Sequence, residues 1–145
     1  NKYDMKLEDG FDNSFFKSYD LVVDGSDTLH TKNLIARNCV SLSKALLTGS
    51  VSQWEGQIFL YDPSFDSSCY SCLYGDLVGT EKNDCNNLGV VGTVAGIVGT
   101  MQANEILKNI LNIGQSLNNY ILIFDLLNLN FRKEKIKKRK NCLCN

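Results

Sequence analysis

Apolar and polar residues alternate in short blocks through the first half of the chain. Residues 21–23 (Leu-Val-Val) form an unbroken apolar triplet that ends in a polar glycine turn at 24–25. Such a triplet is typical of a strand that is covered on both faces, as in parallel α/β sheets. Apolar residues then recur at helical spacing over 34–42, and Asp27 or Thr28 is placed to cap that helix.

Two further apolar segments predict that the chain returns to the sheet. ALLTGSV (45–51) and GQIFLYD (56–62) are typical of strands, with a turn at 54–56 between them. A strand, a helix and another strand at this spacing make half of a doubly wound fold, so we expect an α/β protein. The polar opening, residues 1–18, predicts a short strand followed by a short helix.

The second half begins with a segment of weak periodicity, residues 62–88, which carries three of the six cysteines. Segments of this kind are usually functional or held by a cross-link. From Gly89 the pattern becomes helical and runs to about Ile113, with Gly114 placed to end the helix. Three glycines along one face of this helix are expected to let a neighbouring backbone approach closely. They are Gly92, Gly96 and Gly99.

The last part of the chain predicts a β-hairpin with its turn near 125–128, followed by a close cysteine pair. The basic run FRKEKIKKRK (131–140) is compatible with a nucleic-acid patch. Lysines on a solvated edge strand, where they discourage further pairing, are the more common cause of such a run. We therefore expect an edge strand.

Composition narrows the functional classes. The chain has 15 basic and 16 acidic residues, and this balance argues against a general affinity for nucleic acid. The longest apolar run, 89–101, is shorter than the roughly 18 residues that span a bilayer. The six cysteines are too few and too unevenly spaced for a secreted disulfide scaffold, and no export signal is recognisable. We therefore expect a cytoplasmic protein with reduced thiols.

Four of the cysteines form two local pairs, Cys69 with Cys72 and Cys142 with Cys144. Two local pairs separated by a long insert are how structural zinc sites are usually built. The one-residue spacing of the second pair is narrower than the common spacing. A redox pair of the thioredoxin type and a disulfide remain alternatives to zinc.

The other two cysteines lie in different surroundings. Cys39 falls within a helical pattern, where a buried small apolar residue is the usual role. Cys85 lies in a polar loop just before the long helix. A thiol near a helix N-terminus feels the positive end of the dipole, which favours the thiolate, so Cys85 is a candidate nucleophile.

In order along the chain, five motifs resemble those of the ThiF/MoeB/HesA adenylyltransferases, relatives of the ubiquitin-activating enzymes. They are YDLVVDGSDT, EGQI, CYSCL, DCNNLGVVGTVAGIVGTMQANEILK and the hairpin with its closing cysteine pair. The resemblance covers about residues 19–144. It implies a Rossmann-like three-layer fold with a mixed sheet. It also implies an enzyme that uses ATP to adenylate the C-terminal glycine of a small ubiquitin-like sulfur carrier, as in thiamine or molybdopterin biosynthesis.

The resemblance assigns the cysteines. It implies that a structural zinc ion is bound by two pairs of thiolates, although the family's second pair is normally Cys-x-x-Cys. It also implies that Cys85 corresponds to a crossover-loop cysteine that, in some members, forms a thioester or an acyl-disulfide with the carrier. The implied zinc ligands are Cys69, Cys72, Cys142 and Cys144.

The resemblance also places a nucleotide site. Asp27 corresponds to the second acid of the family's D-x-x-D motif, which lies near the ATP phosphates and Mg²⁺. A carboxylate at the carboxyl end of a strand does stand at the ligand-binding edge of an open α/β sheet. Thr28 and Lys32 replace the usual Asn and Arg, and Lys32 is expected to contact phosphate or the carrier tail more weakly, because it lacks the planar fork.

The family's glycine-rich nucleotide loop has no counterpart, because the sequence contains no GxGxxG. We therefore expect residues 1–145 to be the C-terminal portion of a ThiF-type domain, without the nucleotide-binding N-terminal part. The complete protein is expected to be a homodimer, as is common in the family. An alternative function is a non-catalytic, zinc-stapled carrier-binding module. The expected parts are a lead-in (1–18), a strand-helix-strand-strand core (19–62), a Cys-bearing crossover loop (63–88), a long helix (89–113) and the hairpin with the terminal Cys pair (119–145).

Overall fold

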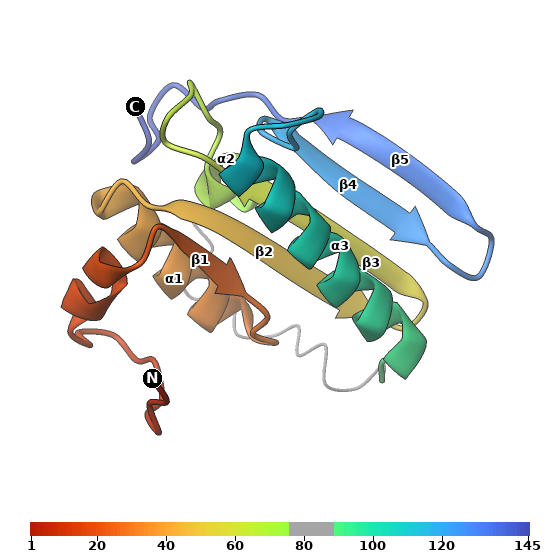
Figure 1. Cartoon of the computed structure of the whole chain (residues 1–145), viewed down its shortest axis with the longest axis horizontal. Helices are drawn as coiled ribbons and strands as arrows, with labels where there is room; N and C mark the ends of the chain where they lie inside the picture. The colour runs from red at the N-terminus through yellow and green to blue at the C-terminus, as the bar shows by residue number, and fades with distance from the viewer. Residues whose placement is uncertain (76–88) are drawn as a thin grey trace.

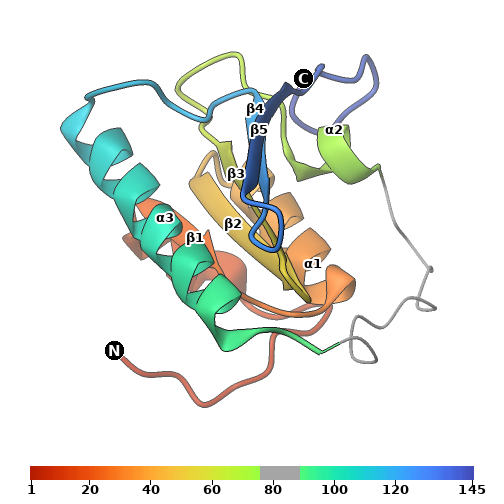
Figure 2. The same ribbon diagram turned by 90° about the vertical axis from the view of Figure 1, so that its right-hand side faces the viewer.

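A computed structural model describes residues 1–75 and 89–145 of the chain as a five-stranded sheet with helices on both faces (Figure 1). Helix α3 covers one face, and α1 and α2 lie on the other, so the elements form three layers (Figure 2). In chain order the elements are η1 (Asn13–Ser18), β1 (Leu21–Asp24), α1 (Leu29–Ser41), β2 (Ala45–Ser52), β3 (Glu55–Tyr61), α2 (Tyr70–Tyr74), α3 (Gly92–Leu111), β4 (Tyr120–Asp125) and β5 (Asn130–Lys135).

The sheet is mixed, with strand order β1-β2-β3-β4-β5. β1 and β2 are parallel and are joined by α1, whereas the other neighbours are antiparallel. A parallel pair needs a crossover connection, while antiparallel strands can be joined by short turns. The predicted α/β class with a mixed sheet and three layers is confirmed.

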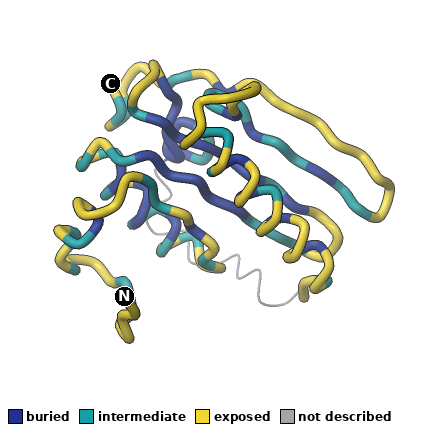
Figure 3. Tube along the Cα trace, viewed as in Figure 1, coloured by how far each residue is buried: buried dark blue, intermediate teal, exposed yellow. Residues whose placement is uncertain are grey.

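The central strands are buried from Ala45 to Gly49 in β2 and from Ile58 to Tyr61 in β3 (Figure 3). This burial explains the apolar runs at 45–47 and 58–61. Successive side chains point to opposite faces of a sheet. Leu46 and Phe59 therefore belong to a core beneath α1 and α2, while Leu47 and Leu60 belong to a second core beneath α3. Each strand thus contributes to two cores at once.

The helix boundaries differ from the predicted ones at both ends of α3. Its N-terminus is at Gly92 because the preceding residues are extended and pair with Gln53 through an isolated parallel bridge. It ends at Leu111, since Asn112 adopts the left-handed conformation, with φ 52° and ψ 48°. Asn tolerates that conformation, so it takes the role that the sequence suggested for Gly114. No helix among the described residues combines the length and apolarity needed to cross a membrane.

Among residues 1–75 and 89–145, no neighbour makes the expected close approach to the glycines of α3. Gly96 and Gly99 are exposed, and a methyl group added at either would meet open space. The close approach is made instead by Gly49 and Gly56 of the sheet, over which Val98 of α3 lies. Among the described residues, the glycines that allow a close approach are therefore those of the strands.

The ends of the chain flank the sheet. No strand forms in residues 1–12, contrary to expectation, and only the 3₁₀-helix η1 precedes β1. The hairpin of β4 and β5 has the predicted turn, where Asp125 accepts hydrogen bonds from the amides of Leu127 and Asn128. β5 is an exposed edge strand, as its lysines suggested.

Gly49→Ala should destabilise the protein by about 1–3 kcal/mol through overpacking. The new Cβ would lie 2.7 Å from a methyl group of Val98 and 2.8 Å from the side chain of Gln102. Urea unfolding measures the change. Gly96→Ala, on the open side of α3, is the matched control and should gain up to about 1 kcal/mol of helix propensity. Equal stabilities for the two variants would contradict this packing.

Candidate functional site

Four thiols from distant parts of the chain meet at one end of the sheet. The sulfur atoms of the two pairs all lie within 4.8 Å of one another. The Sγ–Sγ distances are 3.2 Å from Cys69 to Cys142, 3.6 Å from Cys72 to Cys144 and 3.9 Å within the first pair. The structure thus brings together the four residues that the sequence proposed as metal ligands.

Local structure holds each pair in place. Cys69 is the N-cap of α2, and Gly75 ends that helix with φ 80° and ψ −179°, a conformation that favours glycine. The last turn of the chain is closed by Asn145, whose amide donates to the carbonyl of Cys142. The backbone N–H of Arg139 points at the sulfur of Cys72, at 3.4 Å.

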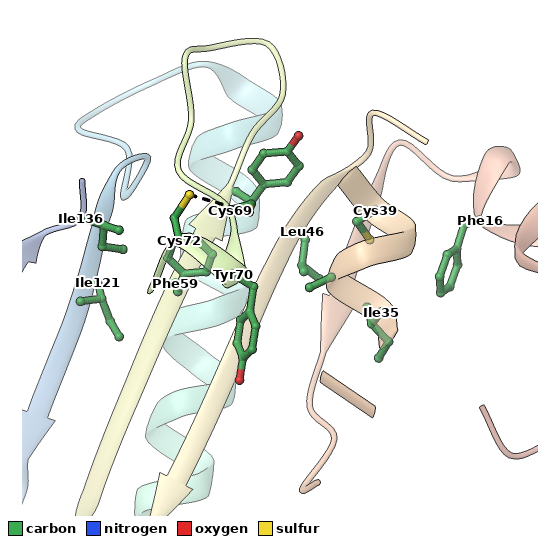
Figure 4. Close-up of a cluster of buried hydrophobic side chains, with 12 residues drawn as sticks. Phe16, Ile35, Cys39, Leu46, Phe59, Cys69, Tyr70, Cys72, Ile121 and Ile136 are labelled. Carbon is green, nitrogen blue, oxygen red and sulfur yellow. Dashed lines mark hydrogen bonds between the residues drawn. The ribbon is translucent and has the colours of Figure 1, made fainter. Parts of the chain in front are cut away.

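The cluster is continuous with a hydrophobic core. Cys69 and Cys72 are buried and lie in the same cluster as Phe59, Ile121 and Ile136 (Figure 4). Two hydrogen bonds from Ser68 join this segment to the neighbouring chain: its amide donates to the Asn119 side chain, and its hydroxyl donates to the carbonyl of Ile136. The thiols therefore connect α2, β3 and the end of the hairpin.

The donor set suits a tetrahedral zinc ion. Zinc–sulfur bonds of about 2.3 Å place tetrahedral thiolates about 3.8 Å apart, close to the separations found here. Burial raises the pKa of the Cys69 thiol and raises that of Cys144 to about 11, so a bound cation would have to displace protons from them. These residues would hold the metal, which would supply a cross-link and no chemistry of its own.

The alternatives to zinc have less support. No cysteine among the described residues is in a disulfide. The position of Cys69 at the N-terminus of α2 resembles a redox pair, but such a pair does not require two more thiols beside it. Cys39 is fully buried in α1, and burial raises the pKa of its thiol to about 12, which agrees with a structural role. Cys85 lies outside the described residues.

The loop that the sequence predicts to bind the nucleotide lies at the opposite end of the sheet. Asp27 is exposed on the loop after the carboxyl end of β1. Thr28, and not Asp27, caps α1 by accepting a hydrogen bond from the amide of Thr31. The Asp27 carboxylate is therefore not used to cap the helix. Residues 89–91 return to the same edge, because they pair with Gln53 at the end of β2.

Lys32 lies in a place that the sequence did not suggest. Its ammonium group is buried and donates to the Asp24 carboxylate at 3.0 Å, the carbonyl of Gly49 at 2.6 Å and the hydroxyl of Thr48 at 3.4 Å. These three acceptors use its three N–H donors. The expectation that Lys32 contacts phosphate does not agree with this geometry, since the ammonium would first have to leave Asp24.

Asp24 is the centre of a fully satisfied buried network. One carboxylate oxygen accepts from the amide and hydroxyl of Ser26, and the other accepts from Lys32 and from Thr48. Burial raises the pKa of Asp24, but the charge of Lys32 and these hydrogen bonds outweigh it, so the pKa lies below its ordinary value. Gln102 of α3 donates to the main-chain carbonyl of Asp24 at 3.1 Å.

Thr48 and Gln102 belong to this network, although the sequence pattern did not mark them as functional residues. Thr48 sits inside an apolar strand, and Gln102 is a polar residue on a largely apolar helix. A buried polar residue usually has a hydrogen-bonding partner. That signal was present at both positions, but the partner could not be identified without the register that places Asp24 beside Thr48.

The chain is a three-layer α/β domain. A four-thiol cluster lies at one end of its sheet, and an acidic loop lies at the other. The model of the ThiF family matches residues 1–145. Over 125 residues the chain is 35% identical to the probable molybdopterin-synthase adenylyltransferase of Gracilaria tenuistipitata var. liui, covering 86% of this chain and 35% of that protein. Over 126 residues it is 39% identical to the adenylyltransferase and sulfurtransferase MOCS3 of Drosophila grimshawi, covering 86% and 28%.

The fold is also similar to that of a solved structure. Escherichia coli MccB, crystallised with ATP, matches with a TM-score of 0.72 and 15% identity, over 96% of this chain and 44% of that one. The chain belongs to the ThiF family, as the resemblance implied. It spans about a third or less of the two curated relatives (35% and 28%).

The thiol cluster should bind one equivalent of zinc in the purified protein, measured by elemental analysis. The double variant Cys142→Ser, Cys144→Ser should lose it, because two ligands cannot replace four. Cys39→Ala is the matched control, since Cys39 is a buried cysteine outside the cluster. Less than about half an equivalent in the native protein, or an equal loss in the control, would count against the site.

Lys32→Met should destabilise the protein by about 3–5 kcal/mol at pH 7, because the Asp24 carboxylate would stay buried and unpaired. The stabilisation from Asp24 is present above its unfolded pKa, near 3.8, and is lost as the pH falls through its lower folded value. The difference between variant and native protein should therefore shrink in acid.

Urea unfolding at a series of pH values measures this difference. Lys6→Met is the matched control, because Lys6 pairs with Glu8 at the same 3.0 Å but at the surface. That exposed pair should contribute little at any pH. A small and pH-independent cost for Lys32→Met would show that the buried pair does not stabilise the fold.

Proposed function

We propose that this chain is part of an ATP-dependent adenylyltransferase that activates the C-terminal glycine of a small ubiquitin-like sulfur carrier. In that reaction a carboxylate oxygen of the glycine attacks the α-phosphorus of ATP. The bond to the β-phosphate oxygen breaks, and pyrophosphate leaves with the electron pair. The product is a carrier acyl-adenylate. The name of the Gracilaria relative favours the molybdopterin type over the thiamine type.

The observation that carries the proposal is the exposed Asp27 at the carboxyl end of β1, in a chain of the ThiF family. Ligands of open α/β sheets bind at this edge. Mg²⁺ is usually held by one or two carboxylates together with substrate phosphates, and a carboxylate that does not cap its helix is available for that role. When bound, Mg²⁺ would neutralise phosphate charge, and Asp27 would fix its position.

In this proposal the thiol cluster binds zinc and has a structural role. The register pairs Tyr61 with Leu46 at one end of the central strands and Glu55 with Ser52 at the other. The cysteine segment follows the Tyr61 end, whereas Asp27 is at the Ser52 end. Zinc would therefore hold the hairpin to the core, far from the phosphates. A homodimer of the complete protein belongs to the same proposal.

Cys85 remains a prediction from the sequence. In the proposed covalent step its thiolate would attack the acyl carbon of the carrier adenylate, and AMP would leave as a thioester forms. Because Cys85 lies outside the described residues, the proposed adenylation step does not depend on it.

A non-catalytic carrier-binding module of the same family is the second candidate. The observation that favours it is the replacement of the family's Asn and Arg by Thr28 and Lys32. Such a module would keep the zinc cluster and the carrier surface without turning over ATP. The two candidates differ in whether the full-length protein exchanges pyrophosphate into ATP.

The full-length protein should catalyse carrier-dependent ATP–pyrophosphate exchange, and the 145-residue chain alone should not. Asp27→Asn should lower the rate about a hundredfold or more, because a charge aimed at the phosphates would be lost. Asp20→Asn, at the other end of β1, is the matched control and should retain the native rate. If the full-length protein binds the carrier but does not exchange pyrophosphate into ATP, the non-catalytic module is favoured. Exchange by the 145-residue chain alone would contradict the expectation that the nucleotide-binding N-terminal part lies outside it.

A further inference from the structure

We propose that Lys32 is a positioning residue, which together with Asp24 and Thr48 fixes the loop that presents Asp27, and that it makes no contact with the nucleotide. The inference rests on the proposed function for the role of Asp27. It concerns residues 24–28, α1 and β2, all of which the structure describes.

All the hydrogen-bond donors of the Lys32 side chain are already used within the protein. The Lys32 ammonium has three donors, and three acceptors from β1 and β2 occupy them. The side chain is 4% exposed, so no surface of the ammonium is presented to a ligand. A phosphate contact would leave Asp24 buried, charged and without its cation, which is strongly unfavourable.

Hydrogen bonds between the Asp24 carboxylate and Ser26 connect Asp24 to the position of Asp27. The Asp24 carboxylate accepts from both the amide and the hydroxyl of Ser26, at 2.8 and 2.6 Å. This ring of hydrogen bonds folds the chain back at Gly25 and sets the direction in which it leaves β1. Asp27 is the next residue after Ser26. Its position therefore depends on the orientation of the Asp24 side chain.

The orientation of Asp24 is fixed by residues from several elements of the fold. Lys32 comes from α1, and Thr48 comes from the neighbouring position on β2, where its hydroxyl donates at 2.7 Å. Gln102 of α3 holds the main-chain carbonyl of the same residue. Three elements thus converge on the residue that begins the loop. A carboxylate held this firmly does not need to reorganise when a metal or phosphate binds to the loop beyond it.

The test is a double-mutant cycle in the full-length protein, with ATP–pyrophosphate exchange as the measurement. Thr48→Val removes one hydrogen bond to Asp24, keeps the shape of the side chain and leaves the charge of Lys32 in place. It should lower kcat/KM about tenfold to a hundredfold, as expected for a misplaced catalytic group. The same change in an Asp27→Asn background should have almost no further effect, because both changes act through Asp27.

The same double-mutant cycle is measured for Lys32→Met, and this variant should lose activity in the same way as Thr48→Val. If Lys32→Met does not fold, the Thr48→Val cycle still tests the proposal.

Amide hydrogen exchange supplies a measurement that does not depend on activity. The amide of Ser26 should exchange faster in both variants, while that of Thr31 should not change, because its hydrogen bond is made to the Thr28 cap. Thr100→Val, which removes an exposed hydroxyl on α3, is the control and should alter neither readout.

Two results would overturn the proposal. The first is a double variant in which the losses of kcat/KM from Lys32→Met and Asp27→Asn multiply. That result would show that Lys32 acts on the nucleotide independently of Asp27. Unchanged exchange at Ser26 in Thr48→Val would show that the network does not hold the loop. If the native protein has no exchange activity, the proposed function fails, and hydrogen exchange at Ser26 still decides whether the network holds the loop.

Discussion

The buried carboxylate of Asp24 is the interaction on which the arrangement of this protein depends. A charge taken out of water is strongly unfavourable unless it is paired and hydrogen-bonded. Here the partners are drawn from separate elements: Lys32 from α1, Thr48 from β2 and Ser26 from the following loop. Satisfying one charge therefore fixes how β1, its crossover helix and its neighbouring strand meet, and it does so at the end of the sheet where we propose that the nucleotide binds.

The two candidate sites lie at opposite ends of the sheet. The four thiols of the thiol cluster gather where β3 ends, and the acidic loop lies where β1 and β2 end. Because β3 runs against β2, these are opposite ends of the same sheet. A metal at the first end can hold the hairpin in place without disturbing the charges at the second. The arrangement separates stability from the proposed phosphate chemistry.

The sequence predicted most of the fold because short apolar runs mark its strands. Such runs marked β1, β2 and β3, and lysines marked β5 as an edge. Among the described residues β1 is not covered on both faces, as its apolar triplet had suggested, because Val23 is 48% exposed. The thiol pairs were found from spacing alone. The network around Asp24 was not. Lys32, 8 positions away, meets Asp24 through the packing of α1 on the sheet, and Thr48, 24 positions away, meets it through strand register. No described residue packs on the glycines of α3, and sequence periodicity does not say which face of a helix is covered.

A crystal structure of the full-length protein with Mn²⁺ and a non-hydrolysable ATP analogue tests the account most directly. The account predicts an anomalous manganese peak about 2.0–2.2 Å from a carboxylate oxygen of Asp27, with the Lys32 ammonium still on Asp24. Manganese bound elsewhere, with Asp27 facing solvent, or a Lys32 ammonium that has moved onto a phosphate, would contradict it.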